Sequence, residues 1–220
     1  MKNNKRNIIY EKLKNEIIFL TYKPNQILNI KELSKKYRVS SVPIREALIL
    51  LEVDKLVRLI PNKGYYVSDI SFSDIIDIFD FRMLLLEICG KLAIEKITKD
   101  EINKLELLLN DLKKEKNRYE FIKIESKFHH LLNCSTKNYS LISTLEYLRN
   151  HLDRLLFFVN TRKEDSYFSK IPKDFEYIIS SLKEKNEEKY IRILKEHAMG
   201  FIELVKKSIY NKSSELNKNN

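Results

Sequence analysis

The hydrophobic positions of the first seventy residues fall into helical stretches followed by a short strand pair. Apolar side chains recur every three or four residues over 9–20 and predict an amphipathic helix, and two further helices are expected over 31–37 and 42–54. Two short apolar runs then flank the turn residues 61–64, which is the pattern of a β-hairpin. The order helix, helix, helix, hairpin predicts a winged helix-turn-helix domain over residues 1–70.

From residue 71 onward the pattern is helical throughout. Ser71 and Thr98 each precede an acidic residue by three positions, which is the signature of a capping box at a helix N-terminus. The polar stretch 161–169 is the most obvious loop. Six helices are expected, over 72–96, 99–116, 119–135, 138–160, 172–185 and 187–210. The fold class is therefore mostly α: after the winged domain comes an all-α six-helix bundle over 71–211, and then a flexible tail over 212–220.

Composition excludes several classes of function. With only three glycines, no glycine-rich phosphate-binding loop can be written, which argues against nucleotide-dependent enzymes. The longest apolar run is far shorter than the roughly 20 residues that span a bilayer, and the basic start of the chain lacks the apolar core of a signal peptide. A cytoplasmic protein without a membrane partner is expected. Its two cysteines, Cys89 and Cys134, are interpreted as reduced, buried packing residues.

The net charge of +10 is unevenly distributed along the chain. Residues 1–70 carry 14 basic and 7 acidic side chains, whereas residues 71–205 carry 23 of each. A general bias toward Lys and Asn, such as an AT-rich genome produces, would also raise the net charge, but it should not spare residues 71–205. The asymmetry therefore favours a nucleic-acid-binding face in the first domain.

The second helix of a helix-turn-helix motif places its first turn in the major groove of DNA. Here that turn holds two serines, which are short donors suited to phosphate, and Arg45, which can reach a phosphate or a guanine edge. A lysine begins the preceding helix, and another lies at the hairpin tip beside a glycine that permits a tight turn. Taken singly, each has an ordinary surface explanation, such as an ion pair between Arg45 and Glu46. The candidate DNA-binding residues are Lys31, Ser40, Ser41, Arg45, Lys63 and Gly64.

The stretch LSKKYRVSSVPIREAL at residues 33–48 resembles the signature of GntR-family regulators, which reads roughly L-A-x-x-L-G-V-S-R-x-P-V-R-E-A-L. The helical remainder is similar to the FadR-type branch, whose all-helical effector domain is of the FCD kind. The resemblance implies a ligand-responsive transcription regulator and covers nearly the whole chain. One departure is Ser41, where the family often has an arginine that reads a guanine. The operator sequence therefore cannot be carried over from the family.

Glu125 and His129 lie four residues apart on one predicted helix, so both side chains project from one face, and His197 on the last long helix could close a metal site. Spacing alone also fits a simple surface contact. The resemblance adds that IESKFH at 124–129 matches a family segment L-D-x-x-F-H whose Asp and His bind metal, and that His197 falls at another ligand. It also implies that Phe175 replaces a family histidine. The implied cofactor is one divalent ion (Zn, Ni or Mn), in either a three-ligand site completed by effector or water, or a vestigial site.

Two arginines are candidates for contact with an effector. Arg82 matches a family position that often faces the effector pocket, and a guanidinium inside an apolar bundle suits a ligand carboxylate held in a bidentate pair. An internal ion pair with Glu87 or Asp153 explains it equally well. Arg149 and Arg154 both lie near the family's pocket arginines in a looser alignment, and Arg154 is taken as the second candidate. The resemblance implies a small organic or sugar acid as effector.

The sequence as a whole predicts a regulator that binds a palindromic double-stranded DNA operator as a homodimer. Two DNA-binding domains related by a two-fold axis match the two half-sites of a palindrome. The resemblance implies that effector binding in the helical domain would shift the placement of the two DNA-binding domains and so change operator affinity. The alternative is an effector-insensitive DNA-binding or architectural protein whose helical domain only dimerises. A metal-dependent enzyme is not expected, because no general base or nucleophile accompanies Glu125, His129 and His197.

Overall fold

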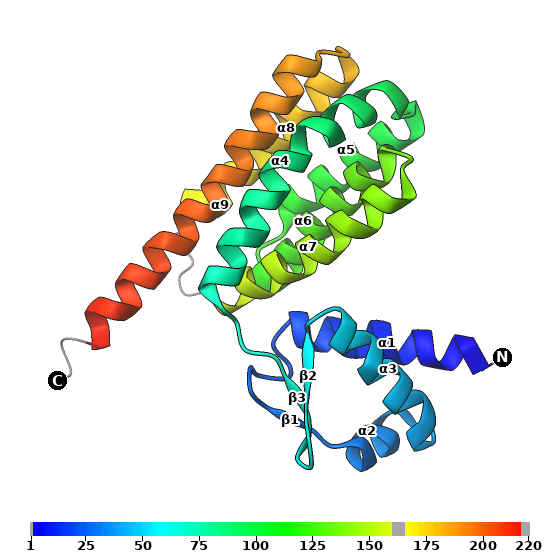
Figure 1. Ribbon diagram of the computed structural model, residues 1–220. Helices are drawn as coiled ribbons and strands as arrows, with labels where there is room; N and C mark the ends of the chain where they lie inside the picture. The colour runs from blue at the N-terminus through cyan, green and yellow to red at the C-terminus, as the bar shows by residue number, and fades with distance from the viewer. Residues whose placement is uncertain (1, 160–165, 217–220) are drawn as a thin grey trace. The chain divides into compact units, whose positions relative to one another are not determined.

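The structure, a computed structural model, describes residues 2–159 and 166–216 (Figure 1). The chain divides into two compact units, each with its own core, and the division falls a few residues after position 70. The first unit comprises Met1–Ile75 and Asp153–Phe158, and the second comprises Ile76–Leu152 and Val159–Asn220.

The first unit is a winged helix-turn-helix. Its helices are α1 (Lys2–Ile18), α2 (Ile30–Tyr37) and α3 (Ser41–Val53), and its strands are β1 (Ile27–Leu28), β2 (Val57–Ile60) and β3 (Gly64–Val67). The strands form one antiparallel sheet in the order β1-β3-β2, so the predicted hairpin gains a third strand from the segment before α2. Helix α1 packs on α3, and the core between them is aliphatic and closed to solvent, with Leu13, Ile17, Ile44, Leu48 and Leu51.

Local signals set the helix-turn-helix. The side chain of Asn29 accepts a hydrogen bond from the backbone N–H of Lys31 at 2.9 Å and so caps α2. Helix α2 ends at Arg38, which adopts a left-handed conformation with φ of 55°. This tight turn is followed by Ser40, the N-cap residue of α3. The spacing fixes where the first turn of α3 begins, and with it the candidate DNA-contacting residues.

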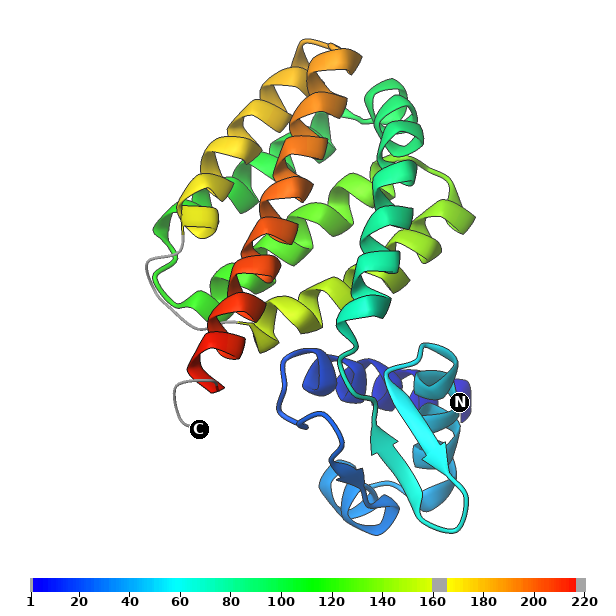
Figure 2. The same cartoon turned by 60° about the vertical axis from the view of Figure 1, so that its left-hand side comes forward.

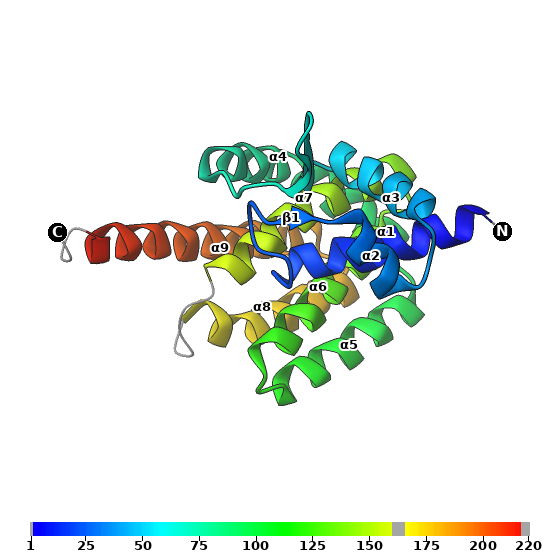
Figure 3. The same ribbon diagram turned by 90° about the horizontal axis from the view of Figure 1, so that it is seen from below.

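The second unit is all helical, as predicted. Its helices are α4 (Phe72–Lys96), α5 (Lys99–Lys114), α6 (Arg118–Ser135), α7 (Tyr139–Phe158), α8 (Ser166–Lys183) and α9 (Glu187–Leu216); the first residues of α4 and the last of α7 belong to the first unit. Figure 2 shows α8 and α9 running side by side, and Figure 3 shows α5 beside α6. The capping box predicted at Thr98 is present, since Thr98 and Glu101 bond each other's backbone N–H.

Two predicted boundaries are wrong. Helix α8 begins at Ser166 rather than at 172, so the expected loop is helical from 166, and its earlier residues lie outside the described part of the chain. Packing of the buried Tyr167 and Ile171 extends the helix upstream of Pro172 and outweighs the backbone hydrogen bond that the proline lacks. Helix α9 continues to Leu216, because no Pro or Gly follows Gly200 to end it, so the expected tail is helical over 212–216.

A glycine allows the close approach of two helices in the second unit. A Cβ atom placed on Gly90 in α4 would lie 2.6 Å from Cγ1 of Ile191 in α9, well inside the contact distance. The two cysteines differ in environment. Cys89 is buried as expected, whereas Cys134 is only half-buried, so the expectation of two buried cysteines is wrong for Cys134.

Candidate functional site

The candidate DNA-binding residues all reach the surface of the first unit. Ser40, Ser41 and Arg45 are exposed around the first turn of α3, and Lys31 is exposed at the start of α2. Within the described part of the chain, the side chain of Ser40 makes no capping hydrogen bond. Its hydroxyl and the first backbone N–H groups of α3 are therefore available to a phosphate, which helix N-termini favour.

The wing presents a basic tip. Lys63 is exposed in the turn between β2 and β3, between Asn62 with φ of 63° and Gly64 with φ of 106°. A left-handed conformation at Gly64 is unfavourable for any residue with a Cβ atom, although no neighbouring atom within 4 Å would obstruct one. The glycine is therefore required by the turn itself, and the turn places Lys63 at the end of the hairpin.

Sequence reasoning missed two further arginines on this unit. Arg38 is exposed at the turn between α2 and α3, and Arg58 is exposed on β2, where its guanidinium donates to the side-chain oxygen of Asn25 at 2.7 Å. Arg58 follows Val57, whose side chain points into the core, and the opposite orientation of successive strand residues could have indicated that Arg58 is exposed. Both arginines add positive charge to the surface around α2, α3 and the wing.

The second unit holds a compact cluster of metal-ligating side chains. Glu125 and His129 from α6 meet His197 from α9, and all three are buried. The Nε2 atoms of His129 and His197 lie 3.1 Å apart, and Oε1 of Glu125 lies 3.7 Å from the first and 3.9 Å from the second. A point equidistant from these three atoms lies about 2.1 Å from each, which is the length of a zinc–nitrogen or zinc–oxygen bond.

The cluster also has outer partners. Asp174 on α8, itself buried, accepts a hydrogen bond from Nδ1 of His197 at 3.2 Å, which leaves the lone pair of Nε2 facing the cluster centre. A carboxylate behind a histidine is the usual support of a metal-binding imidazole. Tyr167 donates to Oε1 of Glu125 at 3.4 Å. The other oxygen of Glu125, Oε2, is buried and has no hydrogen-bond partner among the described residues.

Electrostatics keep one imidazole neutral. Burial is the first cause that holds the pKa of His129 well below its ordinary value, and the positive charge of Arg149, the neighbouring His197 and Arg82 act in the same direction. Arg149 lies within this group, with Nη2 at 3.4 Å from Oε1 of Glu125. The neutral imidazole is the form that binds metal ions.

Phe175 occupies a place beside the two histidines. Its fully buried ring stacks on Phe128 with centroids 3.7 Å apart and lies 5.5 Å from the ring centroids of both His129 and His197. An apolar ring therefore occupies this position on α8, and it offers no atom that could bind a metal ion. Sequence reasoning did not predict the role of Asp174, because its contact joins α8 to α9. Arg149 was placed near the pocket only by a loose alignment with the family, and Arg154 was preferred to it as the candidate.

The two predicted effector arginines lie in different surroundings. Arg82 on α4 is half-buried and close enough to His129 and Cys89 to influence both electrostatically. Arg154 is buried in the first unit, where it donates hydrogen bonds to the backbone carbonyls of Ser68 and Asp69. Burial lowers the pKa of Arg154 to about 10, which leaves it positively charged at neutral pH. The structure thus brings Arg149, and not Arg154, to the histidine cluster.

Comparison with protein-family models gives two matches that together cover most of the chain. Residues 5–67 match the model described as bacterial regulatory proteins, gntR family, and residues 77–199 match the FCD domain. The chain belongs to the GntR family. The exposed residues of α3 and the wing lie in the GntR match, and Glu125, His129 and His197 lie in the FCD match.

Individual relatives of this GntR-family chain are also transcription regulators. It is 29% identical over 185 residues to the HTH-type transcriptional regulator YdhC of Bacillus subtilis, covering 81% of each chain. It is 28% identical over 152 residues to the HTH-type transcriptional repressor RspR of Escherichia coli, covering 68% of this chain and 67% of that protein. The structure of E. coli McbR/YncC has the same fold, with a TM-score of 0.84 and 20% identity over 93% of this chain and 98% of that one.

These matches define the broad function of the GntR-family chain. It is a DNA-binding transcription regulator with an FCD effector-binding domain, and its families and relatives are regulators and not enzymes. In the described ranges, every helix is too short or too polar to cross a lipid bilayer.

Proposed function

We propose that this regulator binds a palindromic operator as a homodimer, and that a small carboxylate-bearing effector bound with a divalent metal ion in the FCD domain changes its operator affinity. The observation that carries the proposal is the buried triangle of Glu125, His129 and His197 with Arg149 beside it. Binding to chromosomal DNA would require a cytoplasmic location.

The donor set fits a metal ion. Two imidazoles and a carboxylate suit Zn, Ni or Mn, and the three donor atoms lie at the spacing of one coordination sphere. The buried oxygen Oε2 of Glu125 gains a partner if the carboxylate coordinates through both oxygens. A bound ion would supply a positive centre, and its remaining positions would be open because Phe175 cannot act as a ligand.

The charge around the cluster suits an anionic effector. Arg149 and Arg82 both act on His129 through their positive charge, and Arg149 lies 3.4 Å from the Glu125 carboxylate. A guanidinium buried at this depth is favourable only beside a negative group. A ligand carboxylate could bind Arg149 while Glu125 turns to the metal. We therefore propose Arg149 and Arg82, in preference to Arg154, as the effector-contacting residues.

An exposed apolar face supports dimerisation. Phe81, Leu84 and Ile88 follow one another at helical spacing on α4 and remain exposed, with Leu84 at 74% exposure. A contact between two copies related by a two-fold axis would bury the same face of both chains. A second copy of the chain would cover this face and provide the second DNA-binding domain that a palindromic operator requires.

Selection of bound duplexes from a random DNA library, at low and physiological salt, tests the DNA half of the proposal. A two-fold symmetric motif that survives the higher salt is expected, because non-specific binding falls steeply with salt. Arg45→Ala should weaken binding to that motif about tenfold or more, since one good base contact contributes about 1–3 kcal/mol. Lys12→Ala, which removes the same charge from α1, serves as the control. Equal binding by both variants would exclude Arg45 from the contact.

Metal analysis and effector titration test the other half. The purified chain, loaded with zinc and dialysed, is expected to retain one ion per chain, and His197→Gln is expected to lose it. Lys173→Gln, which changes an exposed side chain on α8, should retain the ion. Organic and sugar acids are then titrated against the operator complex, and at least one is expected to shift its dissociation constant.

A second candidate function is favoured by the contacts of Glu125. Its ion pair with Arg149 satisfies the buried charge without metal, and Phe175 fills the place of a further ligand. In that case the helical domain only dimerises, and the protein binds DNA without responding to effectors. Specific DNA binding combined with no retained metal and no effector response would establish this second function.

A further inference from the structure

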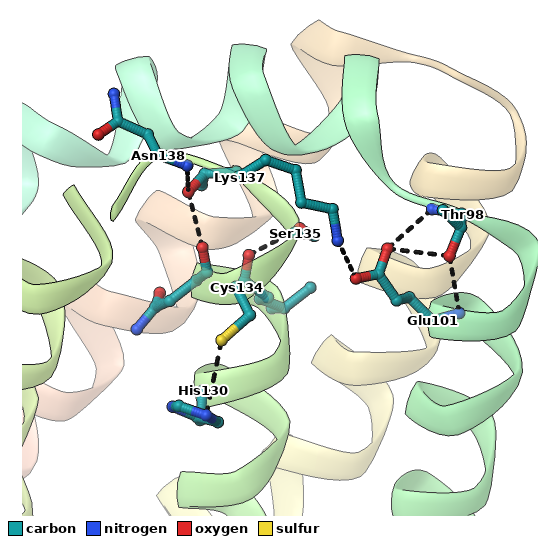
Figure 4. Close-up of polar contacts among 10 residues, drawn as sticks. Thr98, Glu101, His130, Cys134, Ser135, Lys137 and Asn138 are labelled. Carbon is teal, nitrogen blue, oxygen red and sulfur yellow. Dashed lines mark hydrogen bonds and ion pairs between the residues drawn. The ribbon is translucent and has the colours of Figure 1, made fainter. Parts of the chain in front are cut away.

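A second pair of metal-ligating side chains lies at the surface end of α6. His130 and Cys134 are one helical turn apart, and Figure 4 shows the imidazole and the thiol facing each other along the helix. Nε2 of His130 lies 3.5 Å from Sγ of Cys134. The His130 side chain is 58% exposed and Cys134 is half-buried, so a dissolved ion can reach both.

A glutamate from the next helix orients this imidazole. Nδ1 of His130 lies 3.1 Å from Oε1 of Glu146 on α7, and the same oxygen accepts a hydrogen bond from the side-chain amide of Asn133 at 3.0 Å. When Nδ1 carries the proton and donates it to Glu146, the lone pair of Nε2 points to the cysteine. In many metal sites a carboxylate accepts a hydrogen bond from one ring nitrogen of a histidine in this way, and the other ring nitrogen binds the metal ion.

The spacing of the two donor atoms matches a chelated ion. With metal–sulfur and metal–nitrogen bonds of about 2.3 and 2.0–2.1 Å and a tetrahedral angle, the two donor atoms lie about 3.6 Å apart. The observed 3.5 Å therefore needs almost no rearrangement. A thiolate with an imidazole selects soft or borderline cations such as Zn(II), Cd(II) and Cu(I) over magnesium or calcium.

We propose that His130 and Cys134 form a surface site for one thiophilic metal ion, with Glu146 as the residue that positions His130. On binding, the Cys134 thiol releases its proton to solvent and the sulfur and Nε2 each donate a lone pair to the ion; water fills the remaining positions. The site is separate from the buried cluster, because His130 points to the surface from the same helix on which His129 points inward.

Cobalt(II) distinguishes this site from the buried one. Titration of the full chain with cobalt under reducing conditions is expected to give a near-ultraviolet charge-transfer band from thiolate to metal, whose final intensity corresponds to one thiolate-bound ion per chain. Glu125, His129 and His197 contain no sulfur and cannot produce that band. Cys89→Ala and His129→Gln should therefore retain it, whereas Cys134→Ser should abolish it.

The remaining variants test the role of the imidazole. Glu146→Gln should weaken cobalt binding about 10–100-fold, the range found when a supporting group of a metal ligand is lost. His130→Gln removes a ligand itself and should weaken cobalt binding at least as much. Far-ultraviolet circular dichroism checks that each variant remains folded. A band that survives Cys134→Ser, a band unaffected by His130→Gln, or no band at millimolar cobalt would overturn the proposal.

Discussion

At the scale of single residues, Asp174 has the most specific role in the buried cluster, although it does not belong to the ligand triangle. Its carboxylate accepts a hydrogen bond from Nδ1 of His197, which fixes the tautomer and the ring orientation of that imidazole. The exposed Lys170 lies one turn earlier on α8, 3.7 Å from the Asp174 carboxylate. Asp174 thus connects the surface of α8 to a ligand on α9.

Replacement of this carboxylate should weaken metal binding while the ligand set remains intact. Asp174→Asn is expected to lower zinc affinity about 10–100-fold, because an amide supports the required tautomer less well than a carboxylate. Competition with a chromogenic chelator measures the change. Glu176 lies on the same helix as Asp174, is exposed and pairs with Lys113 of α5, so Glu176→Gln should bind zinc as the unchanged chain does. Equal affinities for the two variants would show that His197 needs no such support.

Phe175 allows the opposite test. Phe175→His would place an imidazole beside the cluster and is expected to raise zinc affinity at least tenfold. It should also lower the free energy of unfolding without metal by about 1–3 kcal/mol, since it removes the stacking on Phe128 and buries a polar ring. Denaturant unfolding with and without zinc measures both effects. Phe175→Leu should lose stability without gaining zinc affinity. A similar zinc affinity in both variants would show that the side chain at position 175 does not reach a coordination position of the metal ion.

At the scale of the elements, the contact between α4 and α9 depends on a missing side chain. Gly90→Ala would place a methyl group 2.6 Å from Cγ1 of Ile191, an atom near the backbone that cannot easily move aside. The expected loss in the free energy of unfolding is about 1–3 kcal/mol, which exceeds the gain of about 1 kcal/mol from replacing a helical glycine.

Gly200 on α9 provides the matched control. A methyl group there would lie 3.4 Å from Cδ2 of Tyr167, an ordinary contact, so Gly200→Ala should be neutral or stabilising by up to about 1 kcal/mol. Thermal or denaturant unfolding of both variants compares the two positions. If Gly90→Ala were as stable as Gly200→Ala, the close approach of α4 and α9 would not depend on the glycine.

Most elements could be predicted from the sequence because their signals are local. The bounds expected for 72–96 agree with α4, and the capping box at Thr98 fixes the start of α5. The start of α8 could not be predicted, because the packing of Tyr167 and Ile171 against other helices outweighs the signal at Pro172. Local signals therefore locate the helices, whereas tertiary packing sets some of their ends.

The candidate sites divide in the same way. Glu125 and His129 could be paired from their spacing, and His197 was proposed as a ligand because helix bundles place metal ligands inward. Asp174 and Arg149 belong to helices whose register against α6 and α9 no local pattern records. Arg154 resembled a pocket arginine in the alignment, yet its guanidinium binds the carbonyls of Ser68 and Asp69. The outer contacts of a site depend on how helices pack, and the sequence of one chain does not specify that packing directly.

At the scale of the whole molecule, the proposed dimer rests on the exposed face of α4. Leu84→Glu would place a charge at the centre of the face formed by Phe81, Leu84 and Ile88. The variant is expected to be monomeric by light scattering at micromolar concentration and to lose operator affinity at least tenfold, because two half-sites are no longer bound together. Leu107→Glu, at an exposed leucine on α5, is the control and should remain dimeric. A dimeric Leu84→Glu would place the interface elsewhere.

The central position of β3 in the wing sheet has a consequence for how this protein can change over evolution. Because β1 pairs with β3 through Ile27 and Leu28, an insertion next to these residues would shift the register of β1 by one position and turn the buried Leu28 out of the core. The turn at 61–64 carries no such constraint, since it joins β2 and β3 at their open end. Insertions at the turn could therefore lengthen the reach of the wing along DNA while α3 keeps its place, whereas the segment before α2 should tolerate substitutions but not changes in length.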